Sequence, residues 1–264
     1  LPLMQRRSLL LAAAAGLPFG PLARAEDVAG YRRTAFDAKT LAQATQALGL
    51  ASPQPSRDVQ LSAPDLFEDG TVVPITFGCT LPDVRMLLLG VDRNPTWLAT
   101  LFEPGPGVEP SFGVRLKMLE TSPVIALAVL ADGRVLMARK EVGITLGGCG
   151  GEAEPVTSTK VEPTLIRVTP GARAVTVRAL MKHEMESGQR HDAAGVTLPA
   201  WYIERVVARL NGQAVLNAQW GTAVSKNPFL QFGLRGAKPG DRLALAWADN
   251  RGATRSDEIA IAAA

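Results

Sequence analysis

Cysteine, histidine and aromatic residues are scarce in this sequence. Its 264 residues include two cysteines, two histidines and 5% aromatic residues. Two cysteines form at most one disulfide within a chain, so a small fold held by several bridges is excluded. A phosphate-binding glycine loop and a haem-attachment motif are also missing, and we predict neither a cofactor nor a metal. A hydrophobic content of 47% predicts a packed globular core.

Basic residues show no excess once the N-terminus is set aside. The 28 Lys and Arg residues exceed the 25 acidic residues by three, and Arg6, Arg7 and Arg24 lie within the first 25 positions, which contain no acidic residue. The remaining chain therefore carries 25 basic and 25 acidic residues, without a basic cluster that resembles a phosphate-binding stripe. Nucleic acid is not an expected partner.

The apolar run near the N-terminus is too short to cross a membrane. It covers residues 9–22, is interrupted by proline and glycine, and falls short of the roughly 20 residues that a span needs. Arg6 and Arg7 precede it and small residues follow at 23–25, which is the layout of a secretory signal peptide. Paired arginines favour a twin-arginine signal. We expect a mature periplasmic protein that begins near Glu26 and does not associate with a membrane.

The rest of the chain has the pattern of a β protein with one N-terminal helix. Leu41, Ala44 and Leu48 recur at helical spacing, which predicts a helix over Thr34–Leu48 that ends at Gly49. Short apolar or alternating segments then follow, separated by turn residues. Those before residue 150 are Thr71–Thr76, Met86–Val91, Phe112–Met118, Ile125–Leu130 and Val135–Ala138. Those after it are Leu165–Val168, Ala174–Leu180, Tyr202–Leu210, Ala214–Trp220, Phe229–Leu234, Leu243–Ala248 and Glu258–Ile261.

Two turns fix the expected hairpins most clearly. Asp132-Gly133 joins two of the earlier segments, and Asn211-Gly212 joins two of the later ones. The spacing of turns predicts an all-β fold with two immunoglobulin-like β-sandwich domains. We place a signal peptide at 1–25, a first domain at 26–151, a linker at 152–160 and a second domain at 161–264.

The most informative segment is a cysteine between two pairs of glycines. Cys149 lies between Gly147, Gly148, Gly150 and Gly151. Glycine adds no packing and loses much conformational freedom on ordering, so this segment is poorly suited to a core. It suits a thin arm that presents one reactive thiol, and a thiolate exchanges readily with other sulfur compounds. The residues therefore predict an arm, formed by the four glycines, that delivers the Cys149 thiol to another protein.

Motifs on both sides of this arm resemble the thiosulfate-oxidation carrier SoxYZ, with both subunits in one chain. The SoxY-like marks are Leu61–Pro64, Glu68–Gly70, Val73–Ile75, Asn94-Pro95 and Lys140–Leu146 before the glycines. The SoxZ-like marks are His183–Arg190, Asp192, Asn211-Gly212, Ser225–Pro228 and Trp247–Asn250.

The resemblance implies a carrier that does not itself catalyse a reaction. It implies that a c-type cytochrome couples thiosulfate to Cys149, that a hydrolase releases sulfate, and that a molybdenum–haem enzyme oxidises the remaining sulfur. In SoxY the arm is a free C-terminus, whereas here it continues into the second domain. Fused chains of this kind also resemble carriers associated with quinoprotein dehydrogenases, which would bring another cargo.

Three alternatives remain open from the residues alone. The first concerns Cys79, which is a buried thiol, a resolving thiol for sulfur bound at Cys149, or the disulfide partner of Cys149. With that disulfide, the chain would be a purely structural pair of β-sandwiches. His183 and His191 would join nearby carboxylates in a metal site. Cys149 and His183 would form the nucleophile pair of a thiol hydrolase.

Overall fold

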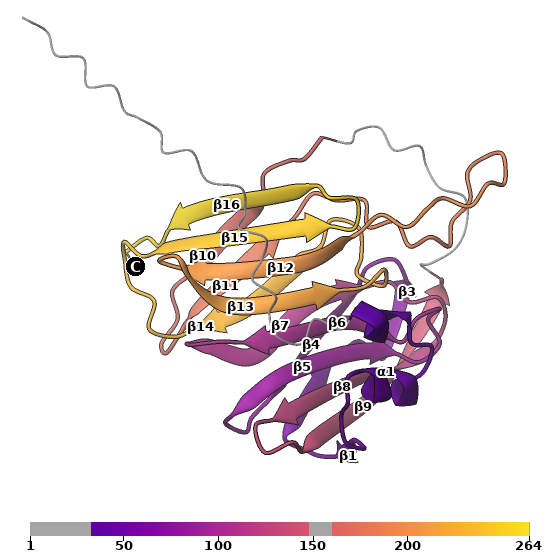
Figure 1. The fold of residues 1–264 in the computed structure, drawn as a ribbon, viewed down its shortest axis with the longest axis horizontal. Helices are drawn as coiled ribbons and strands as arrows, with labels where there is room; N and C mark the ends of the chain where they lie inside the picture. Colours follow the sequence, from indigo (N-terminus) through magenta and orange to yellow (C-terminus); the bar gives the residue numbers. More distant parts are fainter. Residues whose placement is uncertain (1–32, 148–159, 264) are drawn as a thin grey trace, which may run out of the picture. The chain divides into compact units, whose positions relative to one another are not determined.

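The computed structural model describes residues 33–147 and 160–263 of the chain. These residues form a short 3-10 helix, one α-helix and sixteen strands (Figure 1). The N-terminal half contains η1 (Arg33–Asp37), α1 (Leu41–Ala47), β1 (Gln54–Pro55), β2 (Val59–Ser62), β3 (Leu66–Asp69), β4 (Val73–Cys79), β5 (Val84–Val91), β6 (Leu98–Pro104), β7 (Val108–Leu116), β8 (Ser122–Leu130) and β9 (Val135–Leu146). The C-terminal half contains β10 (Leu165–Thr169), β11 (Val175–Leu180), β12 (Ile203–Leu210), β13 (Gln213–Trp220), β14 (Phe229–Leu234), β15 (Arg242–Asp249) and β16 (Thr254–Ala260).

The strands assemble into two sheets, and each sheet draws strands from both halves. The ten-stranded sheet has the order β1-β9-β8-β5-β6-β13-β12-β15-β16, with β3 paired to β9 beside this path. The six-stranded sheet has the order β10-β11-β14-β7-β4-β2. The predicted all-β, immunoglobulin-like class with one N-terminal helix is confirmed.

Hydrogen bonds between antiparallel strands join the two halves at two places. Strand β6 pairs with β13, with Phe102 opposite Ala218, and β7 pairs with β14, with Phe112 opposite Phe232. One hydrophobic core continues between the sheets across both junctions. The Phe102 and Phe112 rings stack at a centroid distance of 4.2 Å, so aromatic packing occurs where the halves meet.

The predicted 15-residue helix is wrong in its extent. Residues 33–47 form η1 and α1 instead of one helix, because Thr40 between them has an extended backbone with φ −136°. Its hydroxyl accepts a hydrogen bond from the Gln43 N–H at 3.2 Å and caps α1. The predicted end is correct, since Gly49 follows α1 with a φ of 65°. No helix among the described residues has the length and hydropathy to cross a membrane.

Strands β5, β6 and β8 are buried on both faces. One face contributes to the main core, and the other packs under η1 and α1 in a second cluster that includes Leu88, Leu98 and Ile125. Strands buried on both sides carry continuous apolar runs instead of alternating ones. This explains the run Leu87–Leu89, and it also explains why no clear period marks β6, which the sequence did not predict.

Candidate functional site

Strand β9 leads directly into the glycine arm. Its first part pairs antiparallel with β8, and its last part pairs parallel with β3, with Leu66 opposite Gly143 and Asp69 opposite Leu146. We call residues 143–147 the arm root. The described part of this segment ends at Gly147, so Gly148, Cys149, Gly150 and Gly151 lie outside the described residues.

The arm root is held by hydrogen bonds on both of its sides. The Gly70 N–H donates to the Leu146 carbonyl at 2.7 Å, and the Thr145 hydroxyl donates to the Phe67 carbonyl at 3.4 Å. On the other side the Ile144 N–H donates to the Thr121 hydroxyl at 3.0 Å. The arm therefore starts from a fixed strand.

Gly147 has a steric reason to be glycine. A Cβ atom built on it would lie 2.1 Å from the main-chain oxygen of Leu119, well inside any permitted contact. The sequence argument gave this glycine the role of supplying reach. The structure adds that the first arm residue passes close to the main chain that follows β7.

That main chain is also tied to the C-terminal half. The amide of Asn94 donates to the Lys117 carbonyl at 2.8 Å and accepts from the Leu119 N–H at 3.0 Å. The buried Lys117 amino group donates to the Met185 carbonyl. Residues 94, 117 and 185 thus connect the arm root to the second half. Asn94 and Met185 lay in motifs of the resemblance, whereas Lys117 lay in none.

Met185 is held in an unusual main-chain conformation. Its φ is 51°, a region that residues with a side chain rarely adopt. Its N–H donates to His183 Nδ1 at 3.0 Å, and its sulfur accepts from the Ile203 N–H at 3.2 Å. Strain of this kind persists where the surroundings enforce it. No sequence pattern could have revealed it, because methionine gives no signal for positive φ.

His183 is a structural residue in a buried polar network. Because Nδ1 accepts a hydrogen bond from Met185, the proton lies on Nε2, which donates to Asp249 Oδ2 at 3.3 Å. The indole N–H of Trp201 donates to the same oxygen at 2.7 Å. Burial lowers the pKa of His183, with hydrogen bonding to Asp249 opposing that shift. Both ring nitrogens are therefore engaged, and neither is available to a metal or a thiol.

His191 lies apart from this network. It is exposed and pairs with Thr197 in an isolated β-bridge. Within the ranges 33–147 and 160–263, no group of three or more His, Cys, Asp or Glu residues is arranged to hold a metal ion. The two histidines are thus not brought together as the metal hypothesis required.

Cys79 is a free, buried thiol at the end of β4. Burial raises its pKa, and a hydrogen bond with the Leu81 main chain opposes that change. Val73, at the other end of β4, pairs with Leu116 near the arm root. Cys79 is six residues further along the strand, which corresponds to about 20 Å at ~3.3 Å per residue.

The length of the chain argues against a bond between the two cysteines. Cys149 is two residues beyond Gly147, a reach of at most about 7 Å, and a disulfide joins Cα atoms up to ~7 Å apart. Together these distances fall short of the roughly 20 Å that separates Cys79 from the arm end of β4. On these distances we expect no disulfide between the two cysteines.

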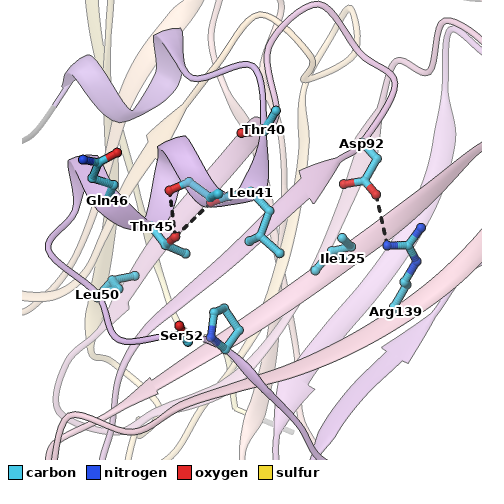
Figure 2. A pocket seen from close by; sticks show the side chains of 11 residues that line it. Thr40, Leu41, Thr45, Gln46, Leu50, Ser52, Asp92, Ile125 and Arg139 are labelled. Carbon is cyan, nitrogen blue, oxygen red and sulfur yellow. Dashed lines mark hydrogen bonds and ion pairs between the residues drawn. The ribbon is translucent and has the colours of Figure 1, made fainter.

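A pocket elsewhere in the N-terminal half has polar groups that already bind one another. It has a volume of about 790 Å³ and lies between α1 and the outer face of β8 and β9 (Figure 2). Asp92 forms an ion pair with Arg139 at 3.2 Å and accepts the Trp97 indole N–H at 2.9 Å. The pocket contains no residue of the arm root, and we assign it no part in the site.

The fold and the arm root define the class of protein: two immunoglobulin-like halves joined into common sheets, with the cysteine of the glycine segment two residues beyond the described end of the arm root. Residues 44–149 match the family model of the sulfur oxidation protein SoxY, and residues 167–260 match that of the sulphur oxidation protein SoxZ. The chain therefore belongs to these sulfur-oxidation families, with a SoxY region followed by a SoxZ region in one polypeptide.

Solved structures with partial similarity include three of different function. The sulfur carrier protein SoxY from Chlorobium limicola f thiosulfatophilum is 24% identical, covers 39% of this chain and 92% of its own, and has a TM-score of 0.36. A superoxide reductase (neelaredoxin) from Ignicoccus hospitalis is 21% identical over 38% of this chain and 86% of its own, with a TM-score of 0.29.

A marsupial T cell receptor is 8% identical over 76% of this chain and 99% of its own, with a TM-score of 0.24. A comparison with curated proteins finds no match. Because all three TM-scores are low, the assignment rests on the two family matches.

Proposed function

We propose that this protein is a periplasmic sulfur carrier that holds sulfur-oxidation intermediates covalently on Cys149 and presents them to partner enzymes. The observation that carries the proposal is the position of this cysteine. The SoxY family match ends at residue 149, two residues beyond a glycine that is fixed against Leu119. Cys79 is buried with a raised pKa, so Cys149 is the thiol suited to exchange.

The resemblance to SoxYZ carriers implies the loading step and the two steps after it. The Cys149 thiol loses its proton and forms a sulfur–sulfur bond with the outer sulfur of thiosulfate, and two electrons pass to a c-type cytochrome. A hydrolase then uses water to cleave the bond between the attached sulfur and the sulfonate group, which leaves as sulfate. A molybdenum–haem enzyme oxidises the sulfur that remains. In these steps the carrier supplies the attachment point and the partners supply catalysis.

Periplasmic location is part of this proposal. Arg6 and Arg7 before an apolar run support export through a twin-arginine signal, and the mature chain would begin near Glu26. The mass of the exported protein tests this directly. A protein that retains residues 1–25 inside the cell would contradict it.

The test of carrier function is the mass of protein isolated without reductant from a host grown on thiosulfate. We expect reductant-sensitive additions of sulfur or sulfonate, located on Cys149 by peptide mapping. Cys149→Ser should abolish them, and Cys79→Ser should leave them unchanged. A Cys149 that remains unmodified in growing cells, or that is bonded to Cys79, would refute the proposal. If Cys149 carries mass additions when the host grows on another compound without thiosulfate, the result would instead indicate the cargo of a quinoprotein dehydrogenase system.

A further inference from the structure

Exposed large hydrophobic side chains gather near the arm root. The described part of the chain has five, and three of them are Leu66, Leu119 and Leu146, with exposed fractions of 67%, 39% and 69%. The main-chain oxygen of Leu119 lies against Gly147, and the other two lie on β3 and β9. The two remaining residues, Leu165 and Val196, lie in the C-terminal half. Exposed apolar groups that gather at one place mark interaction sites.

Strand geometry places these leucines on both faces of one ribbon. We call β3 together with the arm root the arm ribbon. Phe67 and Ile144 are opposite each other and pack against the core, so Leu66 points to the outer face. A Cβ on Gly143 would lie 2.9 Å from Leu66 Cδ1, so that leucine lies over Gly143. Leu146 has the same direction as Ile144 but extends beyond the core.

The same ribbon has a negative rim. Acidic side chains that are exposed near it are Asp65, Glu68, Asp69, Glu120 and Glu141. Two basic residues lie beside them: Lys140, which forms an ion pair with Asp65 at 2.9 Å, and Arg93, whose guanidinium donates to the Thr121 carbonyl at 2.7 Å. The other four carboxylates have no basic side chain within ion-pair distance among the described residues. A partner that fits this surface needs an apolar contact region edged by Lys and Arg.

The short link between the ribbon and the thiol decides how close that partner must come. Cys149 can lie at most about 7 Å from Gly147, measured between Cα atoms. A reactive centre that meets the thiol must therefore approach the arm root to nearly that distance. The walls of its opening then contact both faces of the ribbon, where Leu66 and Leu146 are exposed.

We infer that the arm ribbon and Leu119 form the docking surface for the enzyme that loads Cys149, an enzyme whose opening has apolar walls and a basic rim. This inference rests on the proposed function. The leucines supply apolar contact that water would otherwise cover, and the carboxylates orient the approach. Because the arm is internal, the ribbon itself enters the opening.

The test compares two ways of modifying the same thiol. Periplasmic extract of the thiosulfate-grown host plus thiosulfate loads Cys149 through an enzyme. Tetrathionate modifies the thiol without an enzyme, because the thiolate attacks a sulfane sulfur of tetrathionate and displaces thiosulfate. The variant Leu66→Asn/Leu146→Asn is compared with Leu165→Asn, which changes a leucine of similar exposure in the C-terminal half. Thermal unfolding verifies that each variant is folded.

We expect the double variant to lose about tenfold or more in the rate of enzymatic loading, since interface leucines act through buried contact. Its rate with tetrathionate should equal that of the wild type, and Leu165→Asn should match the wild type in both reactions. Glu68→Lys/Glu141→Lys should slow enzymatic loading and weaken its dependence on salt.

Two results would overturn the inference in distinguishable ways. If the double variant is loaded enzymatically as fast as the wild type, the docking surface is wrong and the carrier function stands. If the extract does not load even the wild type, while tetrathionate modifies Cys149, the proposed function fails and the inference fails with it.

Discussion

The buried Lys117 amino group donates a hydrogen bond to the main-chain carbonyl of Met185, linking the two halves beside the arm root. Lys117 follows β7, and its own N–H donates to the Ala223 carbonyl at 2.6 Å. The next residue, Met118, donates to the Gly70 carbonyl at 2.7 Å, and Gly70 in turn binds Leu146. The C-terminal half therefore supports the segment from which the arm leaves.

Replacing Lys117 with methionine should destabilise the protein. The variant keeps an unbranched side chain one atom shorter than that of lysine, but it leaves the buried Met185 carbonyl without this donor, at a cost of about 1–3 kcal/mol. Urea unfolding monitored by circular dichroism gives the free energy of unfolding. Lys226→Met is the control, because that lysine forms an exposed pair with Glu184 and should change stability by less than about 1 kcal/mol. Equal effects of both substitutions would contradict a supporting role for Lys117.

The stability of the protein should fall with acidification below neutral pH. Burial lowers the pKa of His183 in the folded state, so the unfolded state takes up the proton first. The loss therefore begins as pH falls through the unfolded value of about 6.5 and stops below the lower folded pKa. Unfolding free energies between pH 8 and pH 5 measure it.

The control variants separate this histidine from the other. His183→Gln should lower stability at neutral pH and reduce the slope with pH, whereas His191→Gln should keep the slope of the wild type. Asp249 affects stability in a lower pH range. Burial raises its pKa, but hydrogen bonds from Trp201 and His183 outweigh the effect of burial, so the pKa is lowered. Its contribution is lost below about pH 4. A slope that His183→Gln does not change would contradict the prediction.

Local features of the fold were predictable from sequence because neighbouring residues determine them. Asn211 and Gly212 both have positive φ, at 51° and 83°, and they form the predicted turn between β12 and β13. Gly133, with a φ of 88°, does the same between β8 and β9. The break at Thr40 was missed because the apolar spacing on both sides of Thr40 is that of a helix, while its hydroxyl caps α1 and begins a new helix there.

Long-range features were not predictable. Nothing in the sequence indicates that β6 pairs with β13 or β7 with β14, since register between distant strands depends on the assembled core. The arm was recognisable because a cysteine among glycines is unusual in any fold. Its supports were not, because the links of Lys117 to Met185 and of Gly147 to Leu119 join residues by tertiary contact alone. The domain limits proposed from sequence remain a prediction.

The two thiols should differ in reactivity. Cys79 is buried and its pKa is raised, so little reactive thiolate forms at neutral pH. Iodoacetamide should modify Cys149 in the native protein and reach Cys79 only after denaturation. Mass spectrometry with peptide mapping gives the rate at each site, and Cys79→Ser provides the matched control. An intact mass two hydrogens low, in protein from which mild reductant has removed any cargo, would show a bond between the cysteines. That result would contradict the distance argument.

Gly147→Ala should destabilise the protein although the residue is exposed. The new Cβ meets the main-chain oxygen of Leu119, which must move, and shifts of that kind cost about 1–3 kcal/mol. Leu146→Ala provides the comparison for stability, because that side chain is exposed and its removal should cost under about 0.5 kcal/mol. Chemical denaturation measures both. A Gly147→Ala protein as stable as the wild type would show that the arm leaves β9 by another path.

The two halves should unfold together in one transition. They share both sheets and one core, so a defect in either half should weaken the whole. Phe232 in β14 is 1% exposed and lies opposite Phe112 of the other half. Phe232→Ala should therefore lower the free energy of unfolding by about 3–5 kcal/mol and move a single calorimetric peak downward. If the halves were independent domains, the scan would show two peaks, and only the one that belongs to the C-terminal half would move.

Amide exchange decides between these outcomes residue by residue, because in the coupled case β4 and β8 of the N-terminal half lose protection along with β14. Coupled unfolding would mean that the SoxZ region contributes folding energy to the strand that carries the arm, and that an unstable second half releases the arm root as well.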